Sequence, residues 1–222
     1  MLESAIKSVE NFVREEMEWL CVAHDFLHIE RVVNNTQKIQ QMEWKWDRDV
    51  VTIAALLHES LDEKFFKQKD MDTRKNTIKT LLKSLEIETD KIQQIMFIIG
   101  NVGFGKSLNR EKDFPYTLEF QIVEDADRLE AMWAINIART FAYGSKKGQA
   151  IYDPEMKPKV MADKDSYYAH TGITTSFNHF YEKLLLLKDM IHTKSWRQLA
   201  QPRHDFMVEF MDVFLAEWNN KR

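Results

Sequence analysis

The sequence predicts an all-α fold: a single compact bundle of several helices that takes up residues 1–222 as one domain. Apolar residues recur at three- and four-residue steps along much of the chain, as they do on one face of a helix. Glycine and proline number only six and four, too few for the many tight turns of a β-sandwich. No run reads as a strand, and a chain of 222 residues can bury a sizeable core.

The composition narrows the class of protein. Hydrophobic residues make up 44% and charged residues 30%, an ordinary globular balance. The formal net charge of −4 gives no broad positive field, so neither a nucleic-acid partner nor a membrane partner is expected. The first residues lack the apolar core of a signal peptide, and no apolar run reaches membrane-spanning length. The single cysteine, Cys21, cannot form an internal disulfide. We therefore expect a cytoplasmic protein.

The first three helices are expected in the first sixty residues. Residues 2–20 carry apolar side chains at helical spacing, and a second pattern covers about 25–42, with His28 on its apolar stripe. The third begins near Asp47, a residue type that caps helices, and continues through VVTIAALLHE. Since this segment is apolar almost all round, it should be a central buried helix.

Further helices alternate with polar connections. Residues 60–71 read as a connection, 73–87 and 89–100 as helices, and 101–115 as a loop with two glycines and a proline. A long helix is expected from 117 to 143, closed by Gly144 as its C-cap. A long loop over 144–171 then precedes helical stretches at 173–192 and 195–218, the latter broken or kinked at Pro202.

Three places put metal-ligand residue types on helices that ought to be buried. Taken singly, each has an ordinary explanation as a packed histidine or a solvated carboxylate. The adjacent His58 and Glu59 argue more strongly, because an ionisable pair after AALL is costly to bury unless something such as a cation compensates it. The residues are His24 and His28 in AHDFLHIERV, His58 and Glu59 in ALLHESLDEK, and Asp125, Asp127 and Glu130 in VEDADRLEAM.

Taken in order, these motifs resemble the HD-domain metal-dependent phosphohydrolase superfamily. That family carries HxxRV, then AALLH followed by an acidic residue, then ADRL far downstream. The resemblance is closest to the bacterial branch typified by YpgQ and YedJ, and it covers nearly the whole chain. The segments that carry it are HDFLHIERV, LLHESLDEK, IVEDADRLEA, ARTFAYG, IYDP, NHFYEKLLLLKDM and RHDFM.

The resemblance implies a divalent metal site. Its ligands would be His28, His58, Glu59 and Asp127, with Asp125 as an alternative for the last position. Two imidazoles and two carboxylates suit Mn²⁺, the first choice, and also Mg²⁺, Ni²⁺, Co²⁺ or Fe²⁺. His24 and Asp25 fall on a preceding His-Asp that is not the metal pair, and Asp25 is assigned a supporting role.

The resemblance also implies a reaction. The substrate would be a small-molecule phosphate ester or nucleotide, most simply a nucleoside triphosphate or deoxynucleoside triphosphate split to monophosphate and pyrophosphate. Asp62 would orient or deprotonate the attacking water, and Lys64 would assist it. Arg31, Lys64 and Arg128 would neutralise phosphate charge, although for Arg31 a solvated surface charge is an equal alternative. A phosphate role for Lys106 is left open, as are the oligomeric state and the pocket residues.

Two departures from the family pattern support a second hypothesis. Glu59 stands where the family has aspartate, which adds one methylene, or roughly 1.5 Å of reach. Trp133 and Asn136 replace small, glycine-like residues. The chain could thus be a catalytically degenerate relative that binds metal or nucleotide without turnover. A purely structural helical module would leave the His58–Glu59 pair unexplained.

Overall fold

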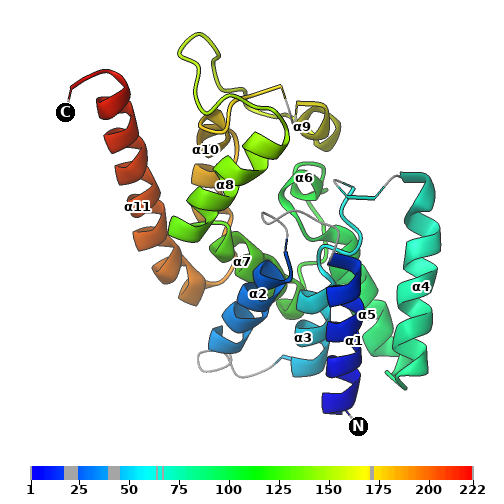
Figure 1. Cartoon of the computed structure of the whole chain (residues 1–222). Coiled ribbons are helices and arrows are strands. Elements are labelled where there is room, and N and C mark those ends of the chain that lie inside the picture. Colours follow the sequence, from blue (N-terminus) through cyan, green and yellow to red (C-terminus); the bar gives the residue numbers. More distant parts are fainter. Residues whose placement is uncertain are drawn as a thin grey trace. The chain divides into compact units, whose positions relative to one another are not determined.

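The computed structural model describes residues 2–17, 25–39, 46–63, 65–66, 68–170 and 173–221 (Figure 1). Across these ranges the regular secondary structure is helical and contains no strand, so the all-α prediction is confirmed. The chain forms two compact units, Met1–Ala126 and Asp127–Arg222. The expectation of one domain remains a prediction. None of the helices in the described ranges is both long enough and apolar enough to cross a membrane.

The first unit is built around one buried helix, α3. Residues Val50–Leu57 of α3 are buried, as the all-round apolar pattern predicts, and the helix contacts α1, α2 and α5 (Figure 1). Helix α4 packs on α5. The elements are α1 (Leu2–Met17), α2 (Phe26–Ile39), α3 (Arg48–Leu57), the 3₁₀ turn η1 (Gln68–Asp70), α4 (Met71–Ser84), α5 (Thr89–Asn101), α6 (Phe104–Ser107) and most of α7 (Leu118–Glu130).

Asp47 fixes the start of α3. Its carboxylate accepts hydrogen bonds from the backbone N–H groups of Asp49 and Val50, at 2.9 and 3.2 Å, which confirms the predicted cap. Lys91 on α5 lies 3.0 Å from the Asp47 carboxylate. Partial burial acts to raise the pKa of Asp47, but the hydrogen bonds from Lys91 and the backbone prevail and hold that pKa below its ordinary value.

A buried ion pair joins the loop after α6 to α7. The guanidinium of Arg110 donates to both carboxylate oxygens of Glu124, with Nη1 2.8 Å from Oε2. Its Nη2 also donates to the Asn101 carbonyl at 2.6 Å. The side chains of Arg110 and Glu124 are only 6% and 1% exposed. Aromatic rings surround the guanidinium, including those of Phe114 and Phe120 at 4.9 and 4.7 Å.

The second unit is organised along its C-terminal helix, α11. This helix contacts η2 and α8, and η2 also contacts α10. Helix α11 continues through Pro202, so a break there, one of the two expected outcomes, is wrong, whereas a kink at this position stays a prediction. Pro202 removes one helical hydrogen bond, but packing of the buried Trp196, Ala200 and Met207 holds the helix together. The elements are α8 (Ala134–Lys146), α9 (Lys164–His170), α10 (Asn178–Glu182), η2 (Leu184–Met190) and α11 (Lys194–Trp218).

The long helix expected over 117–143 is divided in two at Trp133. Its φ of +109° and ψ of −177° belong to a region that is essentially glycine-only, so α7 ends at Glu130 and α8 begins at Ala134. The indole ring stacks on Phe206 at a centroid distance of 5.7 Å, and the guanidinium of Arg203 lies 5.5 Å from its centre. These contacts hold a tryptophan in a glycine-like backbone conformation.

The glycine that ends α8 is Gly148 rather than Gly144, so the predicted cap is wrong. Gly148 has φ +69°, and its N–H donates to the Ser145 carbonyl at 3.1 Å, while Gln149 N–H donates to the Gly144 carbonyl at 2.9 Å. This pattern closes a helix one turn later than expected. Gly144 is instead required by packing, because a Cβ there would lie 1.9 Å from Ser176 Oγ.

Candidate metal centre

His28 lies in the first turn of α2 and is only 3% exposed. Asp25 precedes the helix, and its carboxylate accepts a hydrogen bond from the backbone N–H of His28 at 3.0 Å. A side-chain oxygen in this place satisfies one of the N–H groups that a helix start leaves without an internal partner. Asp25 therefore fixes the backbone from which the His28 imidazole projects.

His58 terminates α3, and Glu59 follows it in the next turn; both are buried. His58 Nδ1 lies 2.8 Å from the Ala55 carbonyl oxygen. Because a carbonyl can only accept, the proton of neutral His58 resides on Nδ1, and Nε2 keeps its lone pair. A hydrogen bond of this kind orients many metal-binding histidines and fixes their tautomer.

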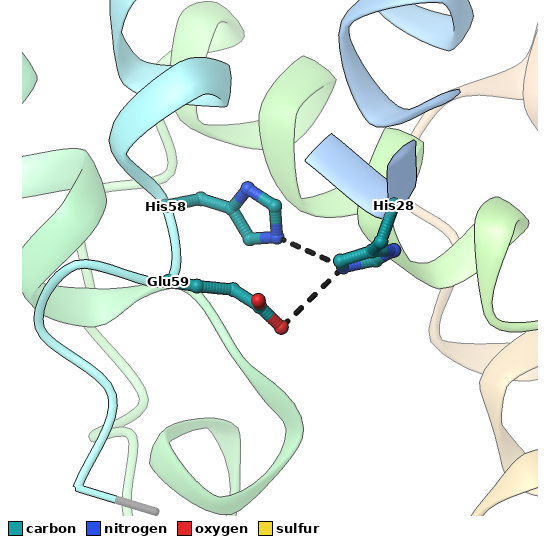
Figure 2. Close-up of side chains that lie close together, drawn as sticks. All are labelled: His28, His58 and Glu59. Carbon is teal, nitrogen blue, oxygen red and sulfur yellow. Dashed lines mark hydrogen bonds and ion pairs between the residues drawn. The ribbon is translucent and has the colours of Figure 1, made fainter. Parts of the chain in front are cut away.

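The three side chains converge from α2 and from the end of α3 (Figure 2). His58 Nε2 lies 3.3 Å from His28 Nε2, and His28 Nε2 lies 3.4 Å from Glu59 Oε1. One ligand atom from each side chain lies within 4.8 Å of the other two. Two donor atoms about 2.1 Å from one ion lie 3.3–3.4 Å apart when the angle between them at the ion is roughly 104–108°.

The chemical types of the three donor atoms also fit a metal ion. Burial of a carboxylate beside two imidazoles is costly unless a cation compensates it. Two imidazole nitrogens and a carboxylate oxygen suit a divalent first-row metal. The residues present therefore fit a divalent metal ion, and the buried His-His-Glu cluster is a candidate site for it.

The proposed fourth ligand lies on α7. Asp127 is half-buried and is the first residue of the second unit, whereas Asp125 is completely buried at the end of the first. The cluster within the described residues consists of His28, His58 and Glu59. Asp127 as a ligand, with Asp125 as its alternative, stays a prediction.

The other predicted residues near the cluster are only partly described. Asp62 lies in the turn after α3, where its N–H donates to the Glu59 carbonyl at 3.0 Å. Arg31 is half-buried on α2, one helical turn from His28. Lys64 and His24 lie outside the described residues. The roles expected of Asp62, Lys64 and Arg31 stay predictions.

In the second unit, Arg128 is buried and makes structural hydrogen bonds. Its Nη1 donates to the Met190 carbonyl and lies 2.9 Å from His192 Nε2. Its role in binding phosphate stays a prediction. His170 Nε2 lies 3.2 Å from Oε1 of the buried Glu182.

Two cationic side chains donate hydrogen bonds to the turn after Glu59, and the sequence does not predict this role for either of them. Arg74 on α4 donates to the Ser60 carbonyl at 3.0 Å, and Lys106 on α6 donates to the Leu61 carbonyl at 3.2 Å. Lys106 is thus bonded to backbone, whereas its motif had left a phosphate role open. No short-range pattern marks Arg74, because its partner lies fourteen residues away.

No family model matches the chain. Among curated proteins it is similar to the uncharacterised protein YpgQ of Bacillus subtilis (strain 168), at 32% identity over 191 residues, which cover 85% of this chain and 81% of that protein. Among solved structures it is similar to a protein of Lactobacillus plantarum, with a TM-score of 0.85 and 29% identity, covering 98% of both chains.

Two further structures connect the chain to named proteins. An HD-superfamily hydrolase from Bacillus thuringiensis matches with a TM-score of 0.71 and 33% identity, covering 99% of both chains. Bacillus subtilis YpgQ in complex with ADP matches with a TM-score of 0.70 and 27% identity, covering 96% of both chains. The resemblance of the ordered motifs is therefore confirmed: the chain belongs to the YpgQ-like branch of the HD-superfamily hydrolases.

Proposed function

We propose that the protein is a divalent-metal-dependent phosphohydrolase that converts a nucleoside triphosphate or deoxynucleoside triphosphate to its monophosphate and pyrophosphate. The observation that carries this proposal is the buried cluster of His28, His58 and Glu59, whose donor atoms have the spacing of ligands to one ion. The nucleotide assignment is supported by YpgQ, whose structure has been solved in complex with ADP.

In this proposal His28, His58, Glu59 and Asp127 hold the ion, with Mn²⁺ as the first candidate. When bound, such an ion lowers the pKa of a coordinated water and polarises a phosphate oxygen. The hydrogen bond from His58 Nδ1 to Ala55 keeps Nε2 free of its proton. The Glu59 carboxylate brings negative charge to the buried cluster and so favours a cation there.

The remaining roles belong to residues beside these ligands. Asp62, in the same turn as Glu59, accepts the proton of the attacking water. Lys64 assists it, and Arg31, Lys64 and Arg128 offset the charge of the phosphates. Arg128 would do so while keeping its bond to the Met190 carbonyl.

The test is metal analysis of the purified protein, followed by a panel of nucleoside triphosphates assayed with Mn²⁺, Mg²⁺ or Ni²⁺. We expect tight binding of one divalent ion and release of pyrophosphate. Glu59→Gln removes a ligand charge at constant size and should weaken metal binding by at least tenfold. The exposed loop variant Glu111→Gln is the matched control and should bind as the wild type does. Absence of turnover on every nucleotide with every metal would refute the hydrolase assignment.

Glu59 favours one second candidate, a degenerate relative that binds metal or nucleotide without turnover. The extra methylene moves the carboxylate relative to the family's aspartate. Glu59→Asp separates the two hypotheses. A large gain in turnover would indicate a degenerate site, whereas a loss would indicate a site adapted to glutamate.

A further inference from the structure

The turn from Glu59 to Asp62 carries both a proposed metal ligand and the proposed base. It follows directly on α3, where backbone carbonyls no longer have helical partners. Ser60 and Leu61 are 1% and 4% exposed, so water is largely kept from this backbone. The direction of the Glu59 side chain therefore depends on which protein groups bond the turn.

Every carbonyl of this turn accepts a hydrogen bond. The Glu59 carbonyl accepts from Asp62 N–H at 3.0 Å, and the Asp62 carbonyl accepts from Phe65 N–H at 3.1 Å. The two carbonyls between them accept from side-chain cations of other elements: Ser60 from Arg74 Nε at 3.0 Å, and Leu61 from Lys106 Nζ at 3.2 Å. Hydrogen bonds from charged donors are stronger than those between neutral groups.

Both cations are themselves fixed by other elements of the first unit. Arg74 pairs with Glu16 of α1, and its guanidinium lies 3.3 Å from the centre of the Phe66 ring. Lys106 donates a second hydrogen bond, to the Ile99 carbonyl of α5, at 3.1 Å. The turn is thereby tied to α1, α4, α5 and α6, none of which supplies a residue of the His-His-Glu cluster.

We propose that Arg74 and Lys106 are positioning residues of the metal centre. By holding the Ser60 and Leu61 carbonyls, they direct the Glu59 carboxylate toward His28 and His58 without touching the ion. The inference rests on the proposed function and deepens it, since it identifies residues on which metal affinity depends. It also gives Lys106 a role at the backbone instead of at phosphate, because two of its three donors are used by carbonyls.

The test compares Mn²⁺ dissociation constants, measured calorimetrically on the full chain well below the unfolding temperature. We expect Arg74→Met and Lys106→Met each to raise the dissociation constant about tenfold, the lower range for groups that orient metal ligands. Arg74→Lys, which keeps the charge and one donor, should recover part of the loss. Lys7→Met is the control, because Lys7 also pairs with a glutamate, Glu10 of the same helix, at 3.1 Å, and is exposed.

Amide hydrogen exchange of the metal-free protein supplies a second readout. Arg74→Met should speed the exchange of the Asp62 and Phe65 amides at least tenfold relative to the amides of α5. If the wild type binds Mn²⁺ and both variants bind it as tightly, the positioning role is wrong. If the wild type itself binds no divalent ion, the proposed function fails instead. A Lys106→Met variant that changes only the KM for nucleotide would return Lys106 to the phosphate role and overturn its assignment here.

Discussion

The buried ion pair between Arg110 and Glu124 offers a quantitative test of how the first unit is held together. Arg110→Met keeps an apolar side chain among the aromatic rings but removes the guanidinium. Glu124, 1% exposed, then loses the cation that its two oxygens contact. The Asn101 carbonyl loses its hydrogen bond from Nη2 as well.

The expected loss of stability follows from the cost of leaving the Glu124 charge buried without its partner. Removal of one partner from such a pair costs about 3–5 kcal/mol of unfolding free energy. At roughly 2–4 °C per kcal/mol for a chain of this size, the melting temperature should fall by about 6–20 °C. The double variant Arg110→Met with Glu124→Leu leaves no charge behind. Its loss should be only about 1–3 kcal/mol, chiefly for the Asn101 carbonyl.

The assay is urea unfolding followed by circular dichroism for the wild type, both single variants and the double variant. The ordering decides the matter, because the double variant should be more stable than Arg110→Met alone. If the double variant is no more stable than Arg110→Met alone, Arg110 stabilises the unit through packing and not by compensating a buried charge.

Substitutions at three other sites, Asp47, Trp133 and Gly144, test the local structure by the same unfolding assay. Asp47→Ala should cost about 1 kcal/mol at pH 7. Since folding lowers the pKa of Asp47, the wild-type advantage is complete above the ordinary pKa and should be lost as the pH falls through the lower pKa of the folded protein. Trp133→Gly should be more stable than Trp133→Ala by about 1–2 kcal/mol, because both lose the ring and only glycine suits φ +109°; equal stability would contradict this. Gly144→Ala should destabilise by about 1–3 kcal/mol through its clash with Ser176, whereas Gly100→Ala, with nothing within 4 Å of its Cβ, should not destabilise; similar losses would contradict the packing argument.

Local chemistry made much of the first unit predictable from the sequence. The apolar run before His58 indicates a buried helix without any knowledge of the segments that pack on it. Asp47 caps that helix by accepting hydrogen bonds from N–H groups only two and three residues away. The adjacency of His58 and Glu59 to this run is visible in the sequence, as is the likeness of the ordered motifs to a known family.

Features that depend on distant partners could not be predicted in this way. The division at Trp133 requires a tryptophan in a glycine conformation, which only its contacts with α11 reveal. The end of α8 at Gly148 depends on which of two nearby glycines adopts positive φ. The packing that requires glycine at 144 comes from Ser176, thirty-two residues on. Arg74 and Lys106 reach the turn after Glu59 from fourteen and forty-five residues away.

Because α3 ends at His58, the number of residues in this helix should be fixed. The Ala55 carbonyl that sets the His58 tautomer belongs to the last turn of a helix that is buried from Val50 to Leu57. Each residue inserted into or deleted from a helix rotates everything beyond it by about 100°. Such a change would turn core side chains outward and the imidazole away from His28 in one event. Insertions and deletions should therefore be excluded between Asp47 and Glu59, even where single substitutions of similar volume are accepted.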